Sequence, residues 1–313
     1  MVRRFLKMIM MAAAVVALMA SCRDDDPVAE AAPAVRDAEV SVSVRFSLPQ
    51  SRTGDPGSGH QEFAEGWDRL DLYFVYDDGS VITERVAHAD FMSPMIFGVY
   101  EGSVQVFAAA VPSEQAEASV RTPDEVRSLT VTDIYNAVQG DDARRKEYML
   151  GFFSGVSAKK EEIVKEQTNE INLVLNRLVA KIDMQWDVQS GVTEGSFVDA
   201  SMSEISFRGY ATGYLFPSEA PTTAVGTVRE LATIDGTVSA RNGRAYFYTF
   251  PGTGCGFDFG LAFTGGTLSG RTTSYNATFN APLEGDAWHK VNVTVRGTNV
   301  SSDASPVAIT LEQ

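Results

Sequence analysis

The chain has 313 residues with 26 basic and 41 acidic side chains, a formal net charge of −15 at pH 7. Its first 21 residues hold three of the bases and no acid, so the remaining 292 residues carry a formal charge of −18. So acidic a chain is not expected to bind nucleic acid, because phosphate binding depends on clustered Lys and Arg. A hydrophobic fraction of 44% excludes wholesale disorder, and two cysteines exclude a disulfide scaffold.

Residues 1–21 have the pattern of a secretory signal peptide. Arg3, Arg4 and Lys7 precede an apolar run over 8–19. At about 1.5 Å per residue this run reaches only about 18 Å, too short for a bilayer core of about 30 Å. The sequence Leu-Met-Ala-Ser before Cys22 resembles the bacterial lipobox, in which the cysteine is acylated and becomes the new N-terminus. We therefore expect lipidation, palmitate included, at Cys22; the alternative is an ordinary signal peptide with an incidental cysteine.

Residues 22–38 are predicted to form a lipidated, flexible tether. An acidic run at 24–26 follows the cysteine. It fits a solvated tether and equally resembles the signal by which Bacteroidetes send lipoproteins to the outer face of the outer membrane. An Ala-rich spacer between Pro27 and Pro33 completes the tether.

Alternating apolar and polar residues predict strands in the first half of the body. The run 40–48 alternates strictly, and the run 70–76 is followed by an Asp-Gly turn at 77–80 and a returning strand over 81–86. Further strands are expected within 99–111 and at 149–153. Thr122, Pro123 and Glu125 have the spacing of a capping box and predict a short helix, with a second helical turn within 133–138.

The second half is also predicted to be β. Two alternating runs, 171–175 and 178–184, are out of phase and meet near Asn176-Arg177, which indicates a bulge or a crossing to another sheet. We place a domain boundary there, giving domains over 39–176 and 177–313. Other strands are expected at 205–216, 244–250, 257–263, 273–279, 291–295 and 307–311. Short strands between Gly-rich turns predict an all-β protein with two β-sandwich domains in tandem and one or two short helices.

Catalytic and ligand-binding patterns are not found in the sequence. His60, His88 and His289 lack metal-ligand spacing, and residues 252–256 are predicted to be a glycine-rich turn entering a strand rather than a phosphate cradle. No catalytic, cofactor or metal residue is nominated, and we expect no enzyme. The three tryptophans could line a sugar platform, although a core or rim role is commoner for such residues. With Cys22 acylated, Cys255 should be a free thiol.

Three segments together carry a family resemblance. They are the Cys22 lipobox with its acidic tail, the sequence Leu-Asp-Leu-Tyr-Phe-Val-Tyr-Asp-Asp-Gly at 70–79, and Leu-Asn-Arg-Leu-Val-Ala-Lys-Ile-Asp at 175–183. Their order and spacing resemble the fimbrillins of Bacteroidales, above all the minor, lipid-anchored fimbrial subunits. The resemblance implies two transthyretin-like β-sandwich domains, no enzymatic activity, and assembly with other fimbrial subunits by strand complementation.

The resemblance also directs attention to the first strand and to two arginines. Stalk subunits of the resembled family lose their first strand when a trypsin-like protease cuts after an arginine. Here the candidate processing residues are Arg36, in the spacer, and Arg45, on the polar face of the first strand. That strand is either the exchangeable element or an ordinary intramolecular edge strand. We expect an anchor subunit on the outer membrane, with a surface glycan-binding β-sandwich lipoprotein as the alternative and any host ligand unidentified.

Overall fold

A computed structural model describes residues 36–47, 66–112, 120–134, 149–188, 199–221, 229–231, 235–236, 241–295 and 307–312. The predicted signal peptide, the lipidated tether up to residue 35, and His60 lie outside these residues. Within the described part of the chain, no helix is both long enough and apolar enough to cross a membrane.

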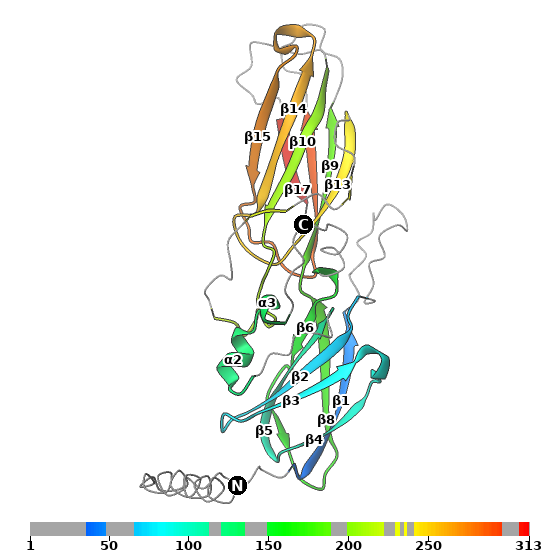
Figure 1. The fold of residues 1–313 in the computed structure, drawn as a ribbon, viewed down its shortest axis with the longest axis vertical. Helices are drawn as coiled ribbons and strands as arrows, with labels where there is room; N and C mark the ends of the chain where they lie inside the picture. The colour runs from blue at the N-terminus through cyan, green and yellow to red at the C-terminus, as the bar shows by residue number, and fades with distance from the viewer. Residues whose placement is uncertain are drawn as a thin grey trace, which may run out of the picture. The chain divides into compact units, whose positions relative to one another are not determined.

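The first half forms one eight-stranded sheet (Figure 1) with the order β3-β2-β5-β6-β8-β1-β4, in which β7 pairs with β5. Its elements are β1 (Ala38–Phe46), β2 (Arg69–Tyr76), β3 (Val81–Ala87), η1 (His88–Asp90), β4 (Met95–Val99), β5 (Gly102–Val111), α2 (Pro123–Ser128), α3 (Val131–Ile134), β6 (Phe153–Val156), β7 (Glu161–Ile163) and β8 (Asn169–Arg177). The sheet folds over on itself, because Phe74 of β2 meets Phe97 of β4 with ring centroids 5.8 Å apart.

The second half forms two sheets. One has the order β11-β10-β14-β15 and the other β12-β13-β9-β16-β17. The strands are β9 (Ala180–Val188), β10 (Asp199–Gly209), β11 (Arg229–Leu231), β12 (Asp235–Gly236), β13 (Asn242–Thr249), β14 (Gly256–Thr264), β15 (Thr272–Thr278), β16 (Trp288–Val295) and β17 (Val307–Glu312), with η2 at Gly266–Leu268. Phe207 of β10 packs on Phe247 of β13 at 5.2 Å, so the two sheets face each other across an aromatic core.

The predicted all-β class with few helices is confirmed, and most of the predicted strands are present. The hairpin forms as expected, with Gly79 at a φ of +88° in its turn. The phase change near Asn176-Arg177 is a crossing between sheets, since β8 belongs to the eight-stranded sheet and β9 to the five-stranded one. The division into domains at that point stays a prediction.

Two strand predictions were wrong in their bounds. Met149 and Leu150 are helical and the strand begins only at Phe153. The reason is that Met149 is fully buried in the core cluster that contains the apolar residues of the second half. The strand predicted to run to Phe216 ends at Gly209. The stretch beyond it packs against the loop after α2, where the Leu215 amide donates to the Leu129 carbonyl at 2.9 Å.

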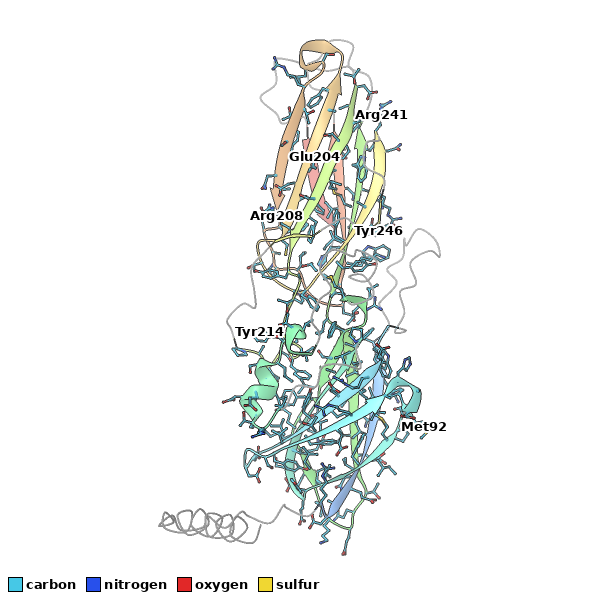
Figure 2. All side chains as sticks on the ribbon, in the orientation of Figure 1. Met92, Glu204, Arg208, Tyr214, Arg241 and Tyr246 are labelled. Carbon is cyan, nitrogen blue, oxygen red and sulfur yellow. The ribbon has the colours of Figure 1, made fainter. Side chains whose placement is uncertain are left out.

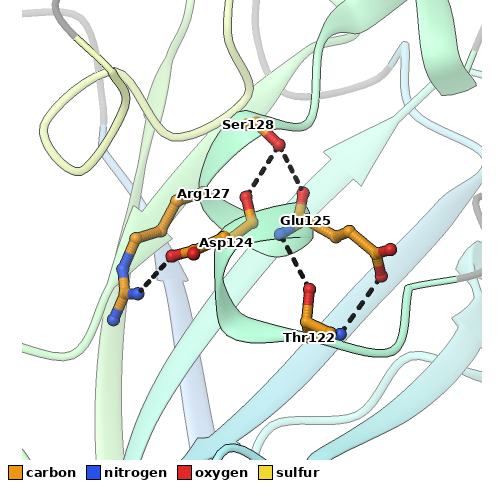
Figure 3. A network of polar contacts seen from close by, with 5 residues as sticks. All are labelled: Thr122, Asp124, Glu125, Arg127 and Ser128. Atoms are coloured by element: carbon orange, nitrogen blue, oxygen red, sulfur yellow. Dashed lines mark hydrogen bonds and ion pairs between the residues drawn. The ribbon is translucent and has the colours of Figure 1, made fainter.

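The predicted capping box at the start of α2 is confirmed (Figure 3). The Glu125 amide donates to Thr122 Oγ1 at 3.3 Å, and the Thr122 amide donates to the Glu125 carboxylate at 3.1 Å. The two side chains satisfy orphan amides of the first turn, so a helix of six residues can form.

Strand β2 is buried on both faces. Leu70, Leu72 and Phe74 belong to the core of the first half, whereas Tyr73 packs on Phe216. The two charged residues of the strand form a buried ion pair, with Arg69 Nε donating to Asp71 Oδ1 at 2.6 Å.

Candidate functional site

The first strand lies between two partners in the interior of its sheet (Figure 1). It pairs in parallel with β8 over Val40–Phe46 and antiparallel with β4 over Ala38–Val42. Its apolar residues Val40, Val42 and Val44 are buried in the core, as the strict alternation predicts. The strand is therefore neither an edge strand nor loosely attached, because both of its backbone sides contribute to a ladder.

Side chains outside the ladders also hold the first strand. Asn169 Nδ2 donates to the Glu39 carbonyl at 2.8 Å, next to the point where β1 begins. Further along, the Val44 amide donates to Ser93 Oγ at 3.0 Å. Ser93 precedes β4, which begins at Met95 opposite Val42, so β4 offers no ladder carbonyl to Val44. The Ser47 amide donates to the Leu175 carbonyl at 2.8 Å and extends the pairing with β8 by one residue.

An aromatic cluster surrounds the last residue of the strand. The ring of Phe46 stacks on Trp67 at 5.3 Å and meets Phe153 and Phe91 edge-on at 5.2 and 6.1 Å. Trp67 in turn stacks on the His88 ring at 4.1 Å. These five residues come from four segments, because His88 and Phe91 both belong to η1 and its C-cap, so the cluster joins the end of β1 to the rest of its half.

A hydrogen bond joins the end of the first strand to the second half. Ser47 Oγ donates to Asp286 Oδ2 at 2.8 Å, and the Asp286 amide donates to the Val179 carbonyl at 3.1 Å. Desolvation raises the pKa of the Asp286 carboxyl, while the Ser47 bond opposes that shift. Gly285 lies so close to the Leu178 carbonyl that a Cβ would stand 2.6 Å from it, so this loop is tightly fitted beside the β8–β9 link.

The two candidate processing residues have different surroundings. Arg36 precedes β1, is exposed, and forms an ion pair with Glu84 of β3. Arg45 is exposed too, but its backbone lies inside β1 opposite Val174 of β8. The lipidation candidate, Cys22, lies outside the described residues.

Other residues that the sequence singled out have structural surroundings. Cys255 is a free, buried cysteine, and burial raises the pKa of its thiol. The turn over 252–256 leads directly into β14, as predicted. His289 is buried in β16. In the described ranges, no group of three or more His, Cys, Asp or Glu side chains is placed to hold a metal ion.

The tryptophans do not form a sugar platform. Trp67 and Trp186 are each only 3% exposed and belong to the cores. Trp288 lies on the outer side of its sheet, with the Lys181 and Lys290 ammonium groups 5.2 and 5.1 Å from its ring centroid. The ring therefore makes cation–π contacts within the chain.

The contacts at the C-terminal end of the first strand were not predicted from the sequence. Neither the Phe46 cluster nor the bond from Ser47 to Asp286, 239 residues away, has a local signal. The strand β4 was missed as well, because its five residues show no clear alternation.

No protein-family model matches the chain, and no curated protein sequence matches it either. Solved structures do match. A fimbrilin from Porphyromonas gingivalis is similar with a TM-score of 0.58 and 10% identity, over 88% of this chain and 97% of that one. A candidate cell adhesion protein from Parabacteroides distasonis has a TM-score of 0.56 and 10% identity, over 90% and 97%.

The fimbrial anchor protein Mfa2 from Porphyromonas gingivalis is similar with a TM-score of 0.50 and 12% identity, over 87% of this chain and 97% of that one. At such identities the likeness shows the fold. The chain has the fold of fimbrial and adhesion proteins of Bacteroidales, and the resemblance stated from the sequence is confirmed at that level.

Proposed function

We propose that this chain is a minor subunit that anchors a fimbria to the outer membrane through lipid at Cys22, and that its role is structural rather than enzymatic. The lipobox and the fold shared with fimbrial proteins both support this proposal. The observation that carries it is the state of the first strand, which is paired on both sides between β8 and β4.

A paired first strand favours an anchor over a stalk subunit. Cutting after Arg45 would remove Val40, Val42 and Val44 and open the slot between β8 and β4. A protease needs an extended, unpaired backbone, so the end of β1 around Arg45 must first detach from β8. Cutting after Arg36 would release the chain from its lipid but leave β1 in place. The mature anchor therefore keeps both Cys22 and its own first strand.

An anchor of this kind ends the fibre. Its slot is filled by its own β1, so it contacts the next subunit through a different edge or terminal strand. A strand that one subunit adds to a sheet edge of another binds through main-chain hydrogen bonds, and its alternate side chains set specificity. Its partners are other fimbrial subunits and, through the lipid, the outer membrane.

The test is Cys22→Ala in cells that make the fibre. Several acyl chains on one residue make release from the membrane slow, and the variant lacks them. The variant protein is therefore expected in the soluble fraction, and fibres that depend on it are expected in the medium. Cys255→Ala is the matched control, because Cys255 is buried in the folded chain and should leave partitioning unchanged. A Cys22→Ala chain that stays in the membrane fraction would contradict the anchor.

A further inference from the structure

Strand β4 forms an exposed edge of the eight-stranded sheet. Within the described ranges it pairs with β1 and with no other strand. Its Ile96 is 72% exposed, and Met92 in the loop before it is 73% exposed (Figure 2). With Val174 at 55%, these are the most exposed large apolar side chains of the described part of the chain. Two of the three therefore lie on or beside one free strand edge.

This edge lacks charged side chains, one of the usual protections against pairing with another strand. The ten residues 91–100 contain no charged side chain, although the chain as a whole has 67 of them. Exposed edges are commonly protected by charge, by Lys above all. The opposite edge of the same sheet, β3, carries Glu84 and Arg85. Of the two edges, β4 is the one suited to accept a further strand of low charge.

The outward face of β4 is complementary to itself. Met95, Phe97 and Val99 pair with the buried face of β1, so Ile96 and Gly98 stand on the opposite face. If a second β4 runs antiparallel with the two-fold axis at Phe97, each Ile96 lies opposite the partner's Gly98. A protruding side chain then meets a position without one, which is what an isologous interface requires.

We propose that β4 pairs antiparallel with β4 of a second copy of this chain. There is room for the contact, because a Cβ on Gly98 would meet only the Arg36 side chain, at 3.8 and 3.9 Å. The partner's Ile96 would cover that gap and lie against the aliphatic stem of Arg36. Pro94 lacks an amide hydrogen and ends the ladder before Met95, which limits the pairing to five residues.

Charge and size set the strength of this dimer. Five residues of strand pairing bury far less than the roughly 1,200–2,000 Å² of a stable interface, so the dimer is weak in solution. Two mature chains of formal net charge −18 repel each other, so added salt tightens the association by screening. The proposal does not depend on the fimbrial role and is tested on the isolated protein.

The test is sedimentation velocity of the mature chain carrying Cys22→Ala, which removes association through lipid. A reversible dimer is expected to appear as concentration rises toward about 500 µM. Ile96→Lys is expected to weaken it by about tenfold or more, since an apolar contact is replaced by charge repulsion across the axis. Gly98→Val should weaken it similarly by occupying the space for Ile96, and it adopts ordinary strand backbone.

Val174→Lys is the matched control, because Val174 is an exposed apolar residue on β8, away from the edge. It should leave the dimer unchanged. In a mixture of Ile96→Cys and Gly98→Cys chains, disulfides are expected between the two variants in preference to either with itself. A wild-type chain that stays monomeric, or a dimer that Ile96→Lys and Gly98→Val leave intact, would overturn the proposal.

Discussion

The retention of the first strand depends on Phe46, and Phe46→Ala should loosen it. Three rings contact this side chain, at 5.3, 5.2 and 6.1 Å. Truncating a fully buried phenylalanine costs about 3–5 kcal/mol, and Phe46 is only partly buried, so we expect about 2–3 kcal/mol. If the free energy of locally opening β1 falls by that amount, the population of chains with β1 detached rises about 30- to 150-fold.

Trypsin cleavage after Arg45 reports this opening, because the backbone there is paired and must detach before it is cut. The cleavage rate should rise by the same factor, whereas cleavage after Arg36, which precedes the strand, should not change. Val174→Ala is the control, since Val174 lies opposite Arg45 but is exposed and outside the aromatic cluster. An unchanged rate at Arg45 in Phe46→Ala would refute the account of how β1 is held.

Three further predictions follow from single contacts. Thr122→Ala removes the cap of α2 and should lower the free energy of unfolding by about 1 kcal/mol in urea titrations, with Thr122→Ser close to wild type. Burial raises the pKa of the Asp286 carboxyl, so this group stabilises the fold fully below its unfolded pKa of 3.8, and the stabilisation is lost as pH rises through its folded pKa. Asp286→Asn should therefore be at least as stable as wild type at pH 7 in thermal melts. Asp286→Ala should be less stable, because φ at this position is +54°. The Cys255 thiol should react with a thiol reagent at pH 8 only after unfolding, and rapid labelling of the folded chain would contradict its burial.

Local patterns were sufficient to predict much of the fold. The alternation over 40–46, the Asp-Gly turn and the capping box each depend on residues within a few positions of one another, and each is present in the structure, whereas Leu48 lies outside the described residues. The failures come from long-range contacts instead. The strand predicted at 149–153 was wrong because core burial of Met149 overrides its β-like pattern.

The surroundings of the first strand could not be predicted from the sequence. Alternation identified its buried face, but it could not show that β8 and β4 occupy both edges, since strand order is a long-range property. The same holds for the bond between Ser47 and Asp286, two polar residues with no local motif around them. The exposed edge of β4 emerged only once the strand order was known.

The mature N-terminus distinguishes an anchor subunit from a stalk subunit. Intact-mass and peptide mass spectrometry of the protein purified from cell membranes would identify it. For an anchor we expect a chain that begins at acylated Cys22 and retains Val40, Val42 and Val44. A chain that begins at Phe46, with the first strand removed, would contradict it and make this protein a polymerising stalk subunit.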